Sequence, residues 1–317
     1  MAWYLSNWFQ TKNHAKAIAG FMIAIPSASA VGSPISTYLL ELNLFGLEGW
    51  QTLFILEAIP SLILGIACFY YLTDSIEEAN WLEADEREWL KNIVAEEQAA
   101  KAKKKKVSFL TALKERDVLI LALGYFAWIC GYYGIVMFLP TLVHGLSSTI
   151  ATTTIGWIIG LMYLLAAFVM YAVGRHSDKV NERRYHVAGC LVVAAVGLVA
   201  SVYIAQSNVI ASLIVFAVAL SGAYGAYSPF WAIPPAYLSG SAAAAGIALI
   251  NSVGNLGGFF GPYVMGYVST VTGSFDAGVL FLAICMVISA FVVTVLVKQT
   301  GKAIDDSKLN AAEAADK

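Results

Sequence analysis

The sequence predicts an all-α integral membrane protein with about eight transmembrane helices, and three observations support this fold class. Of the 317 residues, 59% are hydrophobic and 13% are charged, and the mean hydropathy is +0.71. The apolar residues form runs long enough to cross a bilayer, which takes about 20 helical residues. All 19 Lys and Arg residues lie between these runs or at their edges. A water-soluble domain could not tolerate this composition on its surface.

Eight runs meet the length requirement. They cover residues 15–40, 50–72, 118–142, 150–173, 186–205, 209–231, 242–268 and 277–297. The seventh is rich in Gly and Ala and is the weakest by hydropathy. The six runs after residue 117 divide into two triplets of similar length and opposite expected orientation, which predicts an inverted-topology repeat.

A polar segment at 73–117 separates the first two spans from the other six. It is acidic first and then basic, ending in the run KAKKKK. We interpret residues 73–117 as a cytoplasmic central linker between the remnant of an N-terminal bundle (1–72) and a C-terminal six-helix bundle (118–297). Residues 298–317 form a cytoplasmic tail.

The linker contains apolar residues at roughly helical spacing: Trp81, Leu82, Trp89, Leu90 and Ile93. This spacing predicts an amphipathic surface helix that is solvated or faces lipid headgroups, in preference to a binding module.

The positive charges predict the orientation in the membrane. Lys and Arg occur near both termini, in the linker and in the loop at 175–184, and none lies in the alternate loops. Because basic loops stay on the cytoplasmic side, we expect both termini, the linker and the 175–184 loop to be cytoplasmic. The positions of the charges therefore indicate how the chain is oriented in the lipid bilayer. Because the net charge is -2, no nucleic-acid partner is expected.

Several classes of site are excluded. The four cysteines, Cys68, Cys130, Cys190 and Cys285, lie inside apolar runs without a CxxC pair. We expect buried thiols, no disulfide, no metal and no cofactor. No Ser/His/Asp, Cys/His or paired-carboxylate arrangement occurs at membrane depth, so we do not expect an enzyme.

The loop after the fourth span contains Gly174, Asp178, Lys179, Arg183 and Arg184. Asp178 can pair with a base or cap a helix, and the two arginines can anchor the next helix at the headgroups. The loop is a candidate conformational latch. Ordinary charges that set topology are the alternative.

The loop pattern G-x3-D-K-x3-R-R resembles a short loop of the major facilitator superfamily. The stretches 8–17 (WFQTKNHAKA), 49–65, 72–90 and 251–266 (NSVGNLGGFFGPYVMG) resemble segments of its anion:cation symporter family, the tartrate, phthalate and sugar-acid permeases. The resemblance implies a permease of the bacterial inner membrane that transports small organic anions, such as dicarboxylates or sugar acids. Coupling to a proton or cation, and alternating access, are implied with it.

The same resemblance implies that the chain lacks the first four helices of the family fold, together with an acid and an Arg that bind the proton and the substrate there. Gln10 replaces the usual Pro, and His14 or Lys16 stands where the family carries Arg. The missing helices are expected as a separate or upstream-encoded segment, and the chain alone is expected not to transport. The alternative is a non-transporting membrane subunit or an inactive transporter fragment.

Candidate substrate-binding residues carry hydroxyl or indole groups at membrane depth. Tyr132 and Tyr133 lie in the third span, and Tyr227, Ser228 and Trp231 in the sixth. These groups could bind a carboxylate or a polyol, although aromatic residues are also common at membrane interfaces.

The seventh span adds Asn251 and Asn255 on one helix face. Because unpaired amides are costly in lipid, this pair should line a cavity or form an interhelical hydrogen bond. Four glycines of the same span predict close helix packing: Gly254, Gly257, Gly258 and Gly261.

Glu57 is the one acid clearly inside an apolar run. A charge at the bilayer centre costs about 2.5–3.5 kcal/mol on insertion scales, and less near the interface. Glu57 is therefore either a protonatable gate residue or a carboxylate at the outer rim that caps a neighbouring helix.

Overall fold

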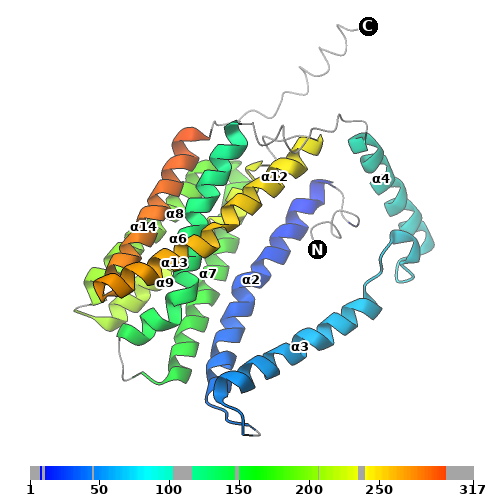
Figure 1. Cartoon of the computed structure of the whole chain (residues 1–317). Coiled ribbons are helices and arrows are strands. Elements are labelled where there is room, and N and C mark those ends of the chain that lie inside the picture. The colour runs from blue at the N-terminus through cyan, green and yellow to red at the C-terminus, as the bar shows by residue number, and fades with distance from the viewer. Residues whose placement is uncertain are drawn as a thin grey trace.

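The computed structural model describes residue 8 and residues 11–44, 46–102, 116–146, 150–205, 207–234 and 240–297, and these described residues are helical with connecting turns. The helices are α2 (Thr11–Leu40), α3 (Gly49–Tyr71), α4 (Ala84–Ala102), α6 (Arg116–Leu146), α7 (Thr152–Val180), α8 (Arg184–Ala205), α9 (Val209–Gly225), α10 (Tyr227–Trp231), α12 (Gly240–Asn255), α13 (Gly257–Thr272) and α14 (Phe275–Phe291) (Figure 1). A 3-10 turn, η1 (Ile76–Glu78), precedes α4, and a π-helical turn, η2 (Val292–Leu296), continues α14.

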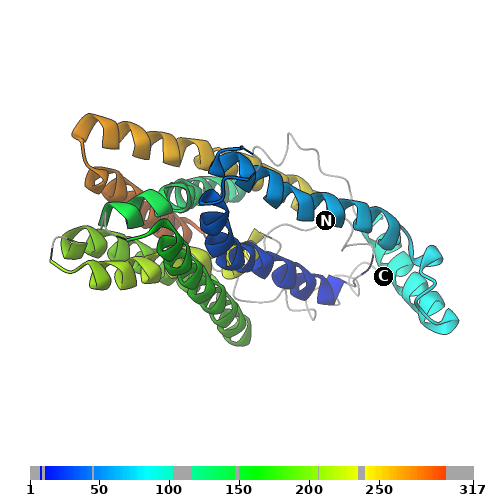
Figure 2. The same ribbon diagram turned by 90° about the horizontal axis from the view of Figure 1, so that it is seen from below.

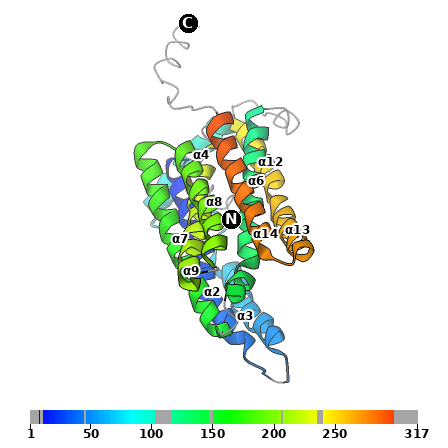
Figure 3. The same cartoon turned by 90° about the vertical axis from the view of Figure 1, so that its left-hand side faces the viewer.

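The helices from α6 to α14, with η2, form a six-helix unit around one apolar core. In Figure 3, α7, α8 and α9 lie on one side and α6, α12, α13 and α14 on the other. Trp128, Phe230 and Leu282 from three different helices are fully buried where the two sides meet. Polar side chains also tie neighbouring helices, since Ser289 Oγ donates to the Gly124 carbonyl at 2.8 Å.

Among the described residues, seven helices are long and apolar enough to cross a membrane, and not about eight. The difference arises in the expected span 242–268, which is divided into α12 and α13 of 16 residues each. The N–H of Leu256 donates to Val253, three residues back, at 3.2 Å, so the helix tightens there into a joint. Gly254, Gly257 and Gly258 flank the joint and weaken the helix on both sides.

The pair α2 and α3 lies beside the six-helix unit. The α2 helix packs along α7, whereas α3 packs on α2 and then leads away from the six-helix unit (Figures 1 and 2). In the apolar window of each of these two helices only 6% of residues are buried, against 72% in α6.

The linker helix expected from the apolar spacing is α4, and it has a small core of its own. Ile76, Ala79 and Val94 are buried together with Trp8, and the Trp8 ring stacks on Trp81 at 5.6 Å. Part of the apolar face is therefore covered by protein. The basic run at 103–106 and the tail at 298–317 lie outside the described residues.

We refer below to the end of the molecule where α2 and α6 begin and α7 and α14 end as the linker end, and to the opposite end as the far end.

Candidate functional site

A cluster of aromatic side chains joins α6 to α9 and α10. Tyr132 and Tyr224 are buried and their hydroxyls are hydrogen-bonded at 2.8 Å, while the indole N–H of Trp128 donates to the carbonyl of Ala223 at 3.1 Å. Only 4% of Tyr132 is exposed, so this predicted substrate residue is a bonded part of the core in this conformation. Its hydroxyl hydrogen is already donated to Tyr224.

The other predicted aromatic residues lie at the edge of this cluster. Tyr133, Tyr227 and Trp231 are half-buried. The Tyr133 ring lies 5.1 Å from that of Tyr132, and the Tyr227 ring lies 5.4 Å from it. Three polar aromatic side chains therefore remain partly accessible around a fixed aromatic base.

A turn separates α9 from α10 within this span. Pro229 has no N–H and so cannot donate to the carbonyl of Gly225, which interrupts the helix at Ala226. Beyond the interruption, Ser228 lies against α7. A Cβ on Gly174 would stand 2.5 Å from the Ser228 Oγ. The structure thus brings a predicted substrate residue into contact with a predicted gating residue.

Asn251 and Asn255 are exposed on α12 and bonded to each other. The Nδ2 of Asn255 donates to the backbone carbonyl of Asn251 at 2.9 Å and to its side-chain oxygen at 3.0 Å. The pair therefore satisfies part of its polar groups locally, on a face that other described residues do not cover.

The four glycines of this segment lie against α6. A Cβ would stand 1.9 Å from a ring carbon of Tyr125 at Gly254 and 2.0 Å from the carbonyl oxygen of Cys130 at Gly261. At Gly257 it would meet the Phe126 carbonyl oxygen at 2.5 Å, and at Gly258 the Tyr133 ring at 3.2 Å. Three of the four distances are too short for any side chain, so α13 approaches the backbone of α6 at Gly257 and Gly261, and α12 packs on the Tyr125 ring at Gly254.

Glu57 does not cap a helix in this structure. Its carboxylate accepts a hydrogen bond from Ser36 Oγ, near the C-terminal end of α2, and the side chain is exposed. Glu57 therefore ties α3 to α2.

A cavity of about 390 Å³ lies where α2 meets α6 and α7. Its polar lining comes from Ser29, Ser33, Ser36, Thr37 and Tyr163. The sequence analysis missed these residues. Their signal was available, because the four hydroxyl-bearing positions of α2 follow the spacing i, i+4, i+7 and i+8 of one helix face.

The contact that closes this cavity on one side is unusually tight. A Cβ on Gly156 would stand 1.8 Å from Thr37 Oγ1, and one on Gly160 would stand 2.7 Å from the carbonyl oxygen of Ala30. Both glycines lie in the first turns of α7, nearer the far end. Small residues therefore bring α2 and α7 together there.

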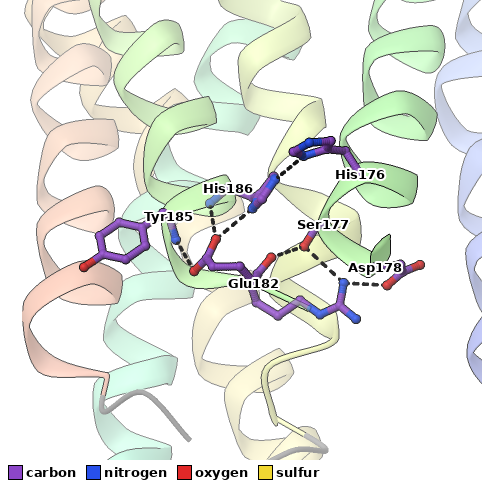
Figure 4. A network of polar contacts seen from close by, with 7 residues as sticks. His176, Ser177, Asp178, Glu182, Tyr185 and His186 are labelled. Atoms are coloured by element: carbon purple, nitrogen blue, oxygen red, sulfur yellow. Dashed lines mark hydrogen bonds and ion pairs between the residues drawn. The ribbon is translucent and has the colours of Figure 1, made fainter. Parts of the chain in front are cut away.

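The predicted latch residues lie where α7 meets α8: Gly174, Asp178 and Lys179 are in the last turns of α7, Arg183 is in the connecting turn, and Arg184 begins α8. Figure 4 shows the polar contacts of this junction. Arg183 pairs with Asp178 at 2.5 Å and donates to Ser177 Oγ at 3.1 Å. Asn181 ends α7 in the left-handed conformation, with φ of 51°. Asp178 and Arg183 thus brace the turn between consecutive helices.

The neighbouring bases of this loop act differently. Arg184 donates from Nε to the carbonyl of Val293 at 3.3 Å and from Nη2 to that of Thr294, so it joins α8 to the π-helical end of α14. Lys179 is exposed and has no ion pair among the described side chains. The contacts of Arg183 and Arg184 lie within the six-helix unit, as described, and do not reach α2.

Glu182 caps the start of α8. Its carboxylate accepts from the backbone N–H groups of Tyr185 at 2.8 Å and His186 at 3.2 Å, and from the His186 ring at 2.7 Å (Figure 4). Partial burial raises the pKa of the Glu182 carboxyl, but the bonds from Tyr185 and His186 together outweigh it, so the pKa is lowered from its usual 4.5. The carboxylate therefore stays ionised at neutral pH.

Comparison with known proteins adds relatives that match nearly the whole chain. The family model described as "Major Facilitator Superfamily" matches residues 1–262 and 150–313. Two Agrobacterium vitis proteins named "Putative tartrate transporter" are similar. One is 43% identical over 92% of this chain and 67% of its own length, and the other is 39% identical over 97% and 68%.

A solved structure shares the fold at low sequence identity. It is described as the "Partially occluded inward open conformation of the xylose transporter XylE from E. coli". The TM-score is 0.67 at 13% identity, with 94% of this chain and 67% of that chain covered.

Proposed function

The chain belongs to the major facilitator superfamily, and from this premise we propose that it serves the secondary transport of small organic anions, dicarboxylates or sugar acids, across a bacterial inner membrane. That it is an integral membrane transporter and not an enzyme follows from the family and from its apolar helices. The observation that carries the proposed substrate class is the 43% identity to a relative named for tartrate.

Alternating access is the mechanism that the α2–α7 contact supports. The two helices meet closely at Gly156 and Gly160, toward the far end, and their ribbons diverge in the view of Figure 2. A contact closed at one end of a helix pair is what a rocking mechanism requires in one of its two conformations. We infer that this conformation is open toward the linker end, which the positive-inside rule assigns to the cytoplasm together with both termini.

The proposed substrate contacts are side chains that are not fully buried. Tyr133, Tyr227 and Trp231 are half-buried and Asn251 and Asn255 are exposed, and we propose that these five contact a carboxylate or a hydroxyl group of the substrate. Tyr132 is proposed to act indirectly, by holding the position of Tyr133 and Tyr227 through ring contacts.

The coupling ion and the four additional helices stay predictions. A proton or another cation is the proposed coupling partner. The chain spans about two thirds of the length of the Agrobacterium vitis relatives, and the rest of those relatives provides a direct way to test whether more of the transporter is needed.

The test is uptake of labelled tartrate into proteoliposomes. One preparation contains this chain alone, and a second contains it fused to the part of the 43% identical relative that it does not cover. Counterflow by the fusion supports organic-anion transport, and its dependence on Tyr227 and Asn255 is measured with Tyr227→Phe and Asn255→Ala. Absence of counterflow with tartrate and with a sugar acid in both preparations, each verified as folded, would refute the proposal.

A further inference from the structure

Two histidines on different helices meet at the linker end. His176 belongs to the end of α7 and His186 to the first turn of α8. The Nδ1 of His176 lies 2.8 Å from the Nε2 of His186, whose Nδ1 lies 2.7 Å from the Glu182 carboxylate (Figure 4). The described residues contain no group of three His, Cys, Asp or Glu side chains arranged to hold a metal ion. The contacts between His176, His186 and Glu182 are hydrogen bonds, and they depend on which ring nitrogens carry a proton.

The protons can occupy this chain in two ways without loss of a hydrogen bond. With both rings neutral, His176 donates to His186, and His186 donates to Glu182. With one added proton, His186 carries a proton on each ring nitrogen and donates to both His176 and Glu182. The hydrogen bond between the two rings therefore forms both without an added proton and with one.

A second added proton changes the contact. Each of the two facing nitrogens then carries a hydrogen, so neither can accept, and two cations stand within hydrogen-bond distance. The hydrogen bond between the His176 and His186 rings is lost, whereas the Arg183–Asp178 ion pair does not depend on it.

We propose that His176 and His186 form a shared proton-binding site at the linker end, which holds one proton with the two rings hydrogen-bonded and loosens the junction of α7 and α8 when it binds a second. The ionised Glu182 carboxylate orients His186 and stabilises the first added proton. The proposal uses only the helix junction and does not depend on the substrate that is transported.

Asp178 is already paired with Arg183, so Glu182 is the acid that serves the histidines. Other ionisable groups with described side chains at the linker end of the neighbouring elements are Arg175 and Lys179 on α7, Arg184 and Tyr185 on α8, and Arg116 and Asp117 on α6. The turn η2 contributes none.

The test follows the histidine rings of the whole chain in lipid nanodiscs. The sequence contains four histidines, so selective ¹⁵N-histidine labelling gives a spectrum that single substitutions assign. As the pH is lowered, we expect the ring signals of His176 and His186 to change together in two separated steps. His176→Gln should merge the changes of His186 into one step, whereas His144→Gln should leave both rings unaffected.

A second measurement reports the junction itself. The amides of Tyr185 and His186 donate to Glu182, and across the second step their hydrogen exchange, corrected for its intrinsic pH dependence, should rise about tenfold. In His176→Gln the rise should be absent. Independent titration of the two rings, or exchange that stays constant through the acid range in the unmodified chain, would overturn the proposal. Because no substrate is present, a negative transport experiment does not affect either outcome.

Discussion

The α3 helix is as apolar as helices of the six-helix unit but is packed differently. The apolar windows of α3 and of residues 209–231 have the same mean hydropathy, 2.1, yet 6% of the first is buried and 56% of the second. What differs is the use of glycine. Gly20, Gly32 and Gly65 in α2 and α3 have no neighbouring atom within 4 Å of an added Cβ, whereas Gly257 and Gly261 meet the backbone of α6. Hydropathy thus determines whether a helix lies in lipid, whereas small residues determine which helices pack closely against it.

The largest expected effect compares one glycine from each region. Gly261→Ala places a methyl group 2.0 Å from the Cys130 carbonyl oxygen, so α13 must move, and we expect a loss of about 2–3 kcal/mol in the free energy of unfolding. Gly65→Ala in α3 meets open space and should be neutral or stabilising by about 0.5–1 kcal/mol. Unfolding in mixed micelles, followed by circular dichroism, measures both. Equal losses at the two positions would contradict the comparison.

The junction between the regions provides the second test. Gly156→Ala brings a methyl group against Thr37 and should weaken the attachment of α2 by about 1–2 kcal/mol while the six-helix unit stays folded. Spin labels at the exposed positions Tyr38 and Trp157 should report a longer and broader distance. Thr37→Ala combined with Gly156→Ala should recover part of the native distribution. An unchanged distribution in the single variant would argue against a glycine-dependent junction.

Tyrosine hydroxyls give a smaller contrast. Tyr132→Phe removes the 2.8 Å bond to Tyr224 in the core and should cost about 1 kcal/mol in the same unfolding assay. Tyr70 is 83% exposed in α3, so Tyr70→Phe should have no measurable effect. A neutral Tyr132→Phe would mean that the aromatic cluster is held by ring packing alone.

The smallest expected effect is pH-dependent. The folded state lowers the pKa of Glu182, so its carboxylate stabilises α8 fully above pH 4.5 and loses this contribution as the pH falls through the lowered value. Glu182→Gln should therefore cost about 0.5 kcal/mol near neutral pH, and the difference from the native chain should vanish in stronger acid. Glu88→Gln on the exposed side of α4 is the matched control, with no expected change at either pH. A difference that persisted unchanged into acid would rule out the charge as its cause.

Much of the helix pattern could be predicted because it depends on local properties. The expected span 50–72 corresponds to α3 (Gly49–Tyr71), and 186–205 to α8 (Arg184–Ala205). The sequence did not predict the joint at Leu256, because hydropathy does not detect a change in hydrogen-bond spacing inside an apolar run. The i, i+4 spacing did predict that Asn251 and Asn255 are neighbours, since that relation needs only one helix.

Contacts between helices could not be predicted in the same way. Tyr132 meets Tyr224 across 92 positions, and Gly174 meets Ser228 because Pro229 interrupts the helix nearby. These relations depend on how helices cross, which the spacing of residues in one chain does not determine. Tyr132 is hydrogen-bonded in the core of this conformation, and its expected place at the substrate stays a prediction. His176 and His186 were not singled out although they lie beside the latch residues.

The joint at Leu256 divides one membrane crossing into two helices, α12 and α13, that can move separately. A continuous helix transmits rotation from one membrane face to the other, because its torsional stiffness is uniform along the axis. Here α13 is held to α6 at Gly257 and Gly261, and the carbonyls next to the joint are bonded with three-residue spacing. Motion of α12 at the linker end can therefore be absorbed at the joint, so that α12 moves while α13 stays fixed against α6.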